Sequence, residues 1–361
     1  MMRIAIAGLG RAGLVHLEAW RSVPGVEVVA ASDPLPAARQ RASEAGLRAY
    51  SDSLAMLESE RLNAVSICTP PADHAQLAIA CFDRGQHVLC EVPLALNTSE
   101  ALQVLRAATR KRCQLLLATK FRHVPEVILA RDLIRAGEIG EPLAFEVSFC
   151  APVDMSQRWN SQRHRSGGGV VIDNGCHAFD VVCFLFGSVK RVHATLLKPL
   201  QRLAVEDSAT VQMEADRGVI GRVDLSWSLA IGRESYLVVY GSRGIMEIGW
   251  HTSRIKLAGQ EWRAFGGSYD KIAAHRDMAT CFKEVVTGSG QGWITALECL
   301  RTVATTDAAY RSVGSGGWEW VKVGRAVERR MGPDGAKGKA KGKLQRPALS
   351  GVEGAKVESL S

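Results

Sequence analysis

Short apolar segments alternate with longer segments of helical periodicity along the first third of the chain. The apolar runs are typical of buried strands, and the segments between them repeat apolar residues every three or four positions, as helices do. Strands are predicted at residues 3–7, 26–32, 63–68, 86–90 and 114–119, and helices at 11–20, 72–84 and 99–112. This alternation predicts a Rossmann-type α/β domain with a doubly wound parallel sheet over residues 1–122.

The pattern changes after residue 122. Helices are expected at 124–136, 167–187, 272–286 and 294–312, and extended segments at 143–149, 189–197, 208–214, 219–227, 236–240 and 245–250. Glycine-containing turns at 216–218 and 241–244 separate the later segments, which indicates an antiparallel sheet. We therefore expect a C-terminal α/β domain over residues 123–330, followed by a disordered low-complexity tail at 331–361.

A glycine-rich turn follows the first predicted strand at once. It has the pattern G-x-G-x-x-G and consists of Gly8, Gly10, Arg11, Ala12 and Gly13, with a helix behind it. The glycines permit a tight turn and a close approach of a pyrophosphate to the backbone, and the helix N-terminus favours an anion. The sequence thus predicts a dinucleotide site at this turn.

The second predicted strand ends in an acidic residue. Asp33 follows the glycines by about twenty residues, the place where a carboxylate binds the adenosine ribose hydroxyls. A carboxylate there repels a 2′-phosphate, so we expect NAD. Arg39 and Arg41 lie close by in the sequence and leave NADP as an alternative.

Three further strand ends are candidate ligand contacts, because ligands of such sheets bind beyond the carboxyl ends of the strands. The residues concerned are Thr69, Pro70 and His74 after the third strand, Glu91 after the fourth, and Lys120 and Arg122 after the fifth. We expect the first four of these to border the cofactor. For His74 a structural or backbone contact is expected rather than catalysis.

The predicted helix at 167–187 carries the best candidates for chemistry. Its positions are mostly apolar, yet Asp173, His177 and Asp180 recur at i, i+4 and i+7 and so share one face. A buried face rarely carries an imidazole between two carboxylates unless they satisfy one another or react. A hydrogen-bonded structural histidine is the alternative, but the dinucleotide motif upstream favours a histidine that moves protons.

Composition and charge are those of an ordinary globular protein, with 361 residues, 47% hydrophobic and 23% charged. The formal charge of +8 is partly concentrated in the lysine-rich segment 337–346, so we expect no nucleic-acid partner. Nine cysteines without a CxxC pair indicate free thiols, a reducing cytoplasm and no metal site. We expect neither a signal peptide nor an apolar run long enough to span a membrane.

Taken in order, these motifs resemble those of the Gfo/Idh/MocA family of sugar and cyclitol dehydrogenases. The resemblance covers residues 1–321 and also includes the segments 137–140, 167–180, 205–208 and 240–244. It implies a Rossmann domain and an α/β domain whose large, mostly antiparallel open sheet forms the interface of a homodimer or homotetramer. It also implies NAD(P)-dependent hydride transfer to or from a secondary alcohol or ketone of a sugar, cyclitol, sugar acid or nucleotide-sugar.

One position departs from the family pattern. The family's Glu-Lys-Pro segment, whose lysine helps to bind substrate and to polarise or deprotonate the reacting oxygen, reads Glu91-Val92-Pro93 here. In one interpretation Lys120, at the end of the neighbouring strand about 5 Å away, replaces that lysine. In the other, catalysis has been lost and the protein is a regulator that binds NAD(P) and a sugar-like ligand. A more remote third interpretation is a scaffold that docks through its basic tail.

The enzyme interpretation assigns definite roles. His177 is the general base in oxidation and the acid in reduction, Asp173 binds the substrate hydroxyl or tunes the imidazole, and Lys120 stabilises the developing alkoxide. The expected substrate contacts are Lys120, Arg122, Trp159, Asp173 and His177, with Arg158, Arg163 and His164 in the same region. Asp180 is expected to support the site without touching the substrate.

Overall fold

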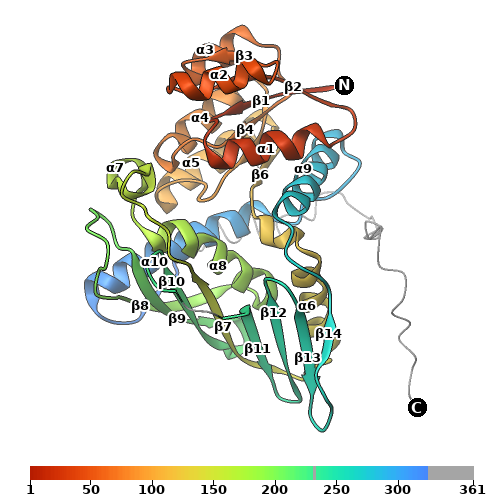
Figure 1. Ribbon diagram of the computed structural model, residues 1–361, viewed down its shortest axis with the longest axis vertical. Helices are drawn as coiled ribbons and strands as arrows, with labels where there is room; N and C mark the ends of the chain where they lie inside the picture. The colour runs from red at the N-terminus through yellow and green to blue at the C-terminus, as the bar shows by residue number, and fades with distance from the viewer. Residues whose placement is uncertain (231–232, 324–361) are drawn as a thin grey trace. The chain divides into compact units, whose positions relative to one another are not determined.

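A computed structural model describes residues 1–230 and 233–323, which form two β-sheets with helices packed on them (Figure 1). The described residues of both sheets belong to one compact unit, Met1–Val323. The tail predicted to be disordered, residues 331–361, lies outside the described residues.

The N-terminal sheet has six parallel strands in the order β3-β2-β1-β4-β5-β6. Its strands are β1 (Met2–Ala7), β2 (Val26–Ser32), β3 (Arg48–Tyr50), β4 (Ala64–Ile67), β5 (His87–Cys90) and β6 (Leu115–Leu117). The helices between them are α1 (Arg11–Arg21), α2 (Pro36–Glu44), α3 (Ser53–Ser59), α4 (Pro71–Asp83) and α5 (Thr98–Lys111). The predicted Rossmann sheet is confirmed, and its strand order reverses between β1 and β4, where such sheets bind ligands.

Continuous apolar runs in the sequence identify the central strands, because helices cover these strands on both faces of the sheet. Ile4, Ala5, Ile6 and Ala7 of β1 are all buried, so the strand reads as a continuous apolar run. The segment from α2 to α3 was not predicted. Its strand β3 is three residues long and only partly buried, which leaves no apolar run to detect.

The C-terminal sheet has nine strands in the order β14-β13-β12-β11-β7-β10-β9-β8-β15. Its strands are β7 (Pro142–Cys150), β8 (Val189–Leu196), β9 (Ser208–Ala215), β10 (Ile220–Ser226), β11 (Ser235–Gly241), β12 (Gly244–Gly249), β13 (Ser253–Leu257), β14 (Arg263–Phe265) and β15 (Glu319–Trp320). All neighbouring pairs are antiparallel except β7 and β10, which are parallel. The mostly antiparallel sheet is confirmed, and β13, β14 and β15, at or next to the two edges of the sheet, are strands that the sequence did not reveal.

The remaining helices complete the fold. They are α6 (Pro125–Ala136), α7 (Arg163–Ser166), α8 (Val170–Phe186), α9 (Lys271–Thr287) and α10 (Ala296–Ser315), with short 3-10 turns η1 (Lys120–His123), η2 (Trp159–Ser161) and η3 (Asp216–Gly218). Helix α8 packs on β7, β9 and β10, while α9 lies beside α1, and α10 contacts α5 (Figure 1). The last two helices therefore pack on the N-terminal sheet's helices as well as on the C-terminal part.

Helix α8 is the buried centre of the C-terminal region. The stretch Arg163–Phe186 is long and apolar enough to cross a membrane by length and composition, which corrects the expectation that no run would be. However, 83% of its most apolar window is buried inside the protein, as in a core helix. Its buried apolar side chains include Val171, Phe179 and Val182, which belong to the same hydrophobic cluster as Val223 and Leu225 of β10.

Candidate functional site

The glycine turn between β1 and α1 is shaped by its surroundings. Gly8 has a φ of +90°, and a Cβ there would lie 2.6 Å from the carbonyl oxygen of Cys68 on the neighbouring β4 side. A Cβ at Gly13 would lie 1.9 Å from the carbonyl oxygen of Gly8, so only glycine lets the helix pack this close. A Cβ at Gly10, by contrast, would meet no atom within 4 Å. Gly10 therefore borders open space in which a ligand fits against the backbone.

Helix α1 presents an uncapped N-terminus to that space. It begins at Arg11, and Gly10 supplies no side-chain hydrogen bond to its first turn, which also lacks an acidic residue. The N–H groups of a first helical turn have no intrahelical acceptors and carry the positive end of the helix dipole. The backbone around Arg11, Ala12 and Gly13 therefore fits the pyrophosphate of a dinucleotide.

Asp33 is buried beside the turn. Its Oδ2 accepts a hydrogen bond from the Leu9 backbone N–H at 2.9 Å, and its Oδ1 accepts one from the Leu35 N–H at 2.9 Å. Arg39 donates to the backbone carbonyls of Asp33 and Pro34, not to the Asp33 carboxylate. Each carboxylate oxygen keeps a second lone pair for a ribose hydroxyl.

The loop after β4 carries three predicted cofactor contacts. Pro70 precedes α4, and the Thr69 hydroxyl is buried with no hydrogen-bond partner among the described residues, so its hydrogen-bonding capacity is unused. His74 is fully buried, and its two ring nitrogens lie 2.7 Å from the carbonyl oxygen of Pro93 and 2.8 Å from that of Thr69. This arrangement ties two strand-end loops together, and it leaves neither ring nitrogen for the cofactor.

Glu91 at the end of β5 is held by α1. Its Oε1 lies 2.8 Å from Nε2 of His16, and its Oε2 accepts a hydrogen bond from the Val92 N–H at 3.2 Å. Burial alone would raise the pKa of Glu91, but the hydrogen bond and charge of His16, together with His275 and Lys120, hold this pKa well below its usual range. Glu91 is thus an ionised carboxylate close to the predicted site.

Helix α8 is fixed in place by the glycines that precede it. The backbone N–H groups of Gly169 and Val171 donate to Oε1 of Glu206 at 2.9 and 3.2 Å. A Cβ at Gly169 would lie 1.9 Å from the Glu206 carbonyl oxygen, and one at Gly168 would lie 1.9 Å from the Tyr310 hydroxyl oxygen. The glycine run and the segment 205–208 therefore set the position of the helix that carries Asp173 and His177.

Asp173, His177 and Lys120 lie near one another. Burial and the Lys120 charge hold the pKa of His177 well below its usual value. Burial raises the pKa of Asp173 from 3.8 to about 6, against the opposing charge of Lys120. The His177 ring lies edge-on to Phe121, with centroids 5.8 Å apart, and Lys120 Nζ lies 5.6 Å from the centroid of that same ring. The group combines an uncharged imidazole, a carboxyl that titrates near pH 6 and an ammonium.

Two features of this region were not visible in the sequence. Lys271, at the start of α9, is an exposed residue, yet desolvation of its ammonium and the charges of Lys120 and Arg11 lower its pKa. Aromatic rings also gather around Phe121, which stacks on Tyr269 with centroids 5.7 Å apart and on Phe149 at 5.0 Å. Both features depend on α9 and the preceding loop returning to η1, a tertiary contact that no local pattern signals.

The position of Arg122 does not fit the substrate contact predicted for this residue. It is fully buried, and its guanidinium donates to both Asp180 oxygens at 2.8 to 3.0 Å, to Glu298 at 2.7 Å and to the Trp293 carbonyl at 2.7 Å. Asp180 accordingly pairs with Arg122, although it follows Asp173 and His177 along the helix. The pair links η1, α8 and α10 inside the protein. Trp159, in η2, is partly exposed.

Comparison with known proteins agrees with this architecture. Residues 2–119 match the model of the oxidoreductase family with an NAD-binding Rossmann fold, and residues 127–247 match a GFO/IDH/MocA C-terminal domain. The chain belongs to the Gfo/Idh/MocA family. The predicted family is thus confirmed, and the chain has an NAD-binding Rossmann fold of this oxidoreductase family.

Several Gfo/Idh/MocA proteins are similar over most of their length. D-apiose dehydrogenase of Paraburkholderia graminis is 28% identical, over 86% of this chain and 88% of that protein. The NAD(+)-dependent scyllo-inositol 2-dehydrogenase of Bacillus subtilis is 30% identical, over 69% and 74%. A structure of levoglucosan dehydrogenase with NADH and L-sorbose superposes with a TM-score of 0.82 at 20% identity, over 89% of this chain and 99% of that chain, and shows the shared fold.

Proposed function

We propose that this chain is an NAD-dependent dehydrogenase that transfers hydride to or from a secondary alcohol or ketone of a sugar-like molecule: a sugar, cyclitol, sugar acid or nucleotide-sugar. The grouping of His177, Asp173 and Lys120 carries the proposal, because it supplies the proton acceptor and the cation that alcohol oxidation requires. The names of the relatives, which include apiose and inositol dehydrogenases, support the substrate class.

Each residue has a defined task in this proposal. When bound at Gly8–Gly13 and Asp33, NAD supplies the hydride acceptor for oxidation and, in reduced form, the donor for reduction. His177 is uncharged at neutral pH because of its lowered pKa, so a ring nitrogen accepts the hydroxyl proton during oxidation. Lys120 stabilises the negative charge that develops on the substrate oxygen, and Asp173 holds a substrate hydroxyl.

Lys120 is the best replacement for the family lysine that is absent at Val92. Strands β5 and β6 are adjacent and parallel, with Cys90 opposite Leu117, so Val92 and Lys120 follow neighbouring strand ends. The Lys120 charge acts on Glu91, which directly precedes Val92, and on Asp173 and His177. Lys271 is a second cation beside the same site.

The remaining features follow from the same site and fold. Asp33 favours NAD over NADP because its carboxylate is free of the two nearby arginines, which donate to backbone carbonyls. Ile220 and Tyr240 both pair with Ala144 of β7 and are exposed together on one face of the nine-stranded sheet, which supports a homodimer or homotetramer built through this sheet. A cytoplasmic location and the absence of nucleic-acid and membrane partners remain predictions.

The test is a turnover assay with a panel of sugars, cyclitols, sugar acids and nucleotide-sugars. Nicotinamide absorbance monitors oxidation and reduction, each with NAD and with NADP. His177→Ala is expected to lower kcat by about 10²–10⁴-fold while KM changes little, because the imidazole transfers the proton in the transition state and contributes little to substrate binding. His251→Ala, which removes an exposed imidazole between β12 and β13, serves as the control and keeps wild-type rates. An unchanged kcat in His177→Ala would remove the acid–base assignment.

Val92 favours a second candidate function, a non-catalytic regulator that binds NAD(P) and a sugar-like ligand. This candidate keeps the glycine turn and the aromatic surroundings of Phe121 but needs no proton acceptor. Tight NAD binding together with a ligand from the panel, and no turnover of that ligand, would favour it. Turnover of any panel member excludes it.

A further inference from the structure

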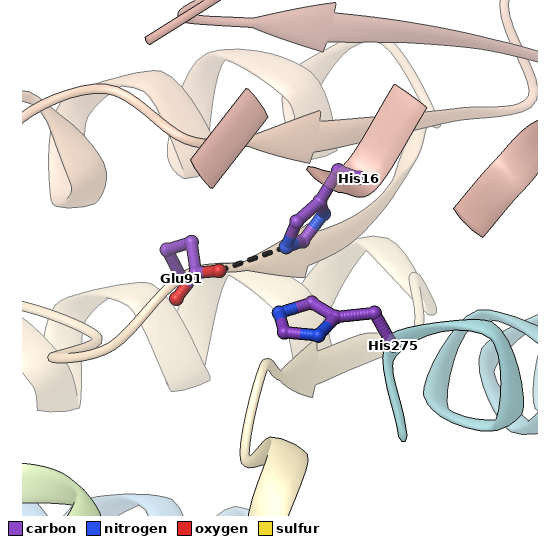
Figure 2. A group of neighbouring side chains, drawn as sticks. All are labelled: His16, Glu91 and His275. Carbon is purple, nitrogen blue, oxygen red and sulfur yellow. Dashed lines mark hydrogen bonds and ion pairs between the residues drawn. The ribbon is translucent and has the colours of Figure 1, made fainter. Parts of the chain in front are cut away.

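Two histidines and a glutamate meet where α1, β5 and α9 come together. His16 lies on α1, Glu91 follows β5 and His275 lies on α9, and one ligand atom from each lies within 4.8 Å of the other two (Figure 2). His16 is 1% exposed and His275 is 3% exposed, while the Glu91 side chain is 15% exposed. The cluster is thus nearly enclosed and opens at Glu91.

The proton on His275 is fixed by its backbone neighbour. Its Nδ1 lies 2.7 Å from the carbonyl oxygen of Lys271, an atom that only accepts hydrogen bonds. Nδ1 therefore carries the hydrogen, and Nε2 carries a lone pair. In the described part of the chain no group donates a hydrogen bond to Nε2. A buried imidazole with an unused lone pair is prepared to bind a cation.

His16 is held in the same manner from behind. Its Nδ1 lies 2.7 Å from Oγ of Ser66, which also accepts a hydrogen bond from the Trp20 indole N–H at 3.2 Å. Nε2 lies 2.8 Å from Oε1 of Glu91 and donates a hydrogen to that carboxylate, while Nδ1 can accept the hydroxyl hydrogen of Ser66. A metal ion bound between Nε2 and Glu91 would displace the Nε2 hydrogen, because metal ligands bind in their deprotonated form, and Nδ1 would then donate to Ser66. Hydrogen bonds from the distal nitrogens of ligating histidines are the usual support of a metal site.

We propose that His16, Glu91 and His275 bind a divalent first-row transition-metal ion, Zn²⁺ being the ion that two imidazoles and a carboxylate suit best. Three protein ligands leave one tetrahedral position for water. Ligand atoms around tetrahedral Zn²⁺ lie about 3.4 Å apart, given metal–ligand distances of about 2.0–2.2 Å. The side chains, whose ligand atoms span up to 4.8 Å, must therefore close in by roughly 1 Å, which His275 and the partly exposed Glu91 can do by rotation.

The metal would have a structural and an electrostatic effect, and neither depends on the proposed dehydrogenase function. It would link α9 to α1 and to the end of β5. It would also neutralise the Glu91 charge, which acts on the pKa of Lys271. Because the residues are far apart in the sequence (His16 and Glu91 by 75 positions), no motif spacing reveals the site.

The test uses Co²⁺ as a spectroscopic probe for the Zn²⁺ site in the full chain, after removal of metals with a chelator. We expect one equivalent of Co²⁺ to produce the visible absorption of a four-coordinate ion, and Zn²⁺ to displace it. Glu91→Gln, which keeps the shape of the side chain, and His275→Ala should each weaken Co²⁺ binding by at least about tenfold. His251→Ala, which removes an exposed imidazole, should leave binding unchanged.

Melting temperature provides a second readout that does not rely on the variants folding equally well. Zn²⁺ should raise the melting temperature of the wild-type chain, because a ligand that binds only the folded state stabilises it. The same addition should leave Glu91→Gln unchanged. Absence of the Co²⁺ spectrum in the wild-type chain, or an equal spectrum in both cluster variants, would overturn the proposal.

Discussion

Replacement of Asp173 by asparagine tests the electrostatics of the site most directly. Burial raises the pKa of this carboxyl from 3.8 to about 6 even though Lys120 attracts the charged form. The folded chain therefore binds the proton more tightly than the unfolded chain does. Between pH 4 and pH 6 stability falls as the pH rises, and above pH 6 the full cost of the buried charge is present.

The size of the effect follows from the shift. One pKa unit corresponds to about 1.4 kcal/mol, so the change from 3.8 to about 6 corresponds to about 3 kcal/mol for a fully shielded group. The Asp173 side chain is partly exposed, and solvent screening reduces this to about 1–3 kcal/mol. Asparagine has nearly the same shape and no charge. At pH 8 Asp173→Asn should therefore unfold with a free energy higher by about 1–3 kcal/mol.

The assay is urea unfolding without cofactor at pH 8 and at pH 5, with tryptophan fluorescence as the readout. The advantage of Asp173→Asn should shrink at pH 5, where most of the folded wild-type chain is already protonated at this carboxyl. Asp277→Asn, at an exposed position on α9, serves as the matched control and should show no such pH dependence. The same Asp173→Asn chain should lose about 10–100-fold in kcat/KM, because a hydrogen bond from substrate to a charged group is lost.

A destabilised Asp173→Asn chain at pH 8 would refute this reasoning. It would mean that the carboxylate is stabilised in the folded state by interactions that outweigh burial. A stabilised chain with unchanged kcat/KM would keep the electrostatics but remove Asp173 from the substrate site. The two measurements thus separate the state of the carboxyl from its role.

Three further predictions address the remaining parts of the site. Gly10→Ala should fold normally but bind NAD weakly. Gly13→Ala, whose Cβ would lie 1.9 Å from the Gly8 carbonyl oxygen, should also lower the melting temperature. Calorimetry measures the NAD affinity of both variants, and thermal unfolding measures their stability. Lys120→Met should lower kcat/KM by roughly 10²-fold with little change in NAD affinity, and equal turnover would remove its alkoxide role. Arg122→Met should cost about 3–5 kcal/mol in urea unfolding because Asp180 is left buried and unpaired, and Arg122→Met with Asp180→Leu should recover much of this; a mild single variant would contradict the buried pair.

The sequence predicted what depends on local pattern. The strands of the parallel sheet are continuous apolar runs, the glycine turn joins a strand to a helix, and the long apolar stretch at 167–187 forms a helix, α8. These features determine the fold class and bring Asp173 and His177 onto one helix face. The short strand β3 and the strands β13 to β15, at or next to the sheet edges, lack such runs and were missed.

What the sequence did not predict depends on contacts between distant segments. Arg122 looked like a ligand contact because it follows a strand end, but its partners Asp180 and Glu298 come from α8 and α10. Lys271 and His275 lie in an ordinary amphipathic helix, and only the packing of α9 on α1 and η1 brings them to Glu91. A charged residue at a strand end therefore identifies a candidate, and its partners decide between a structural and a functional role.

The charges around position 92 give an electrostatic reason for a valine, rather than a lysine, at this position. Glu91 is partly buried and ionised, and the hydrogen bond from His16 and the charge of Lys120 already stabilise its negative charge. Desolvation and the Lys120 charge lower the pKa of Lys271, so the ammonium groups here already repel one another. A further lysine at position 92 would add a third ammonium beside Lys120 and Lys271 and would lower the pKa of Lys271 further. Replacement of that lysine by valine is thus consistent with an active site whose cation has moved to Lys120, and it does not by itself indicate that catalysis has been lost.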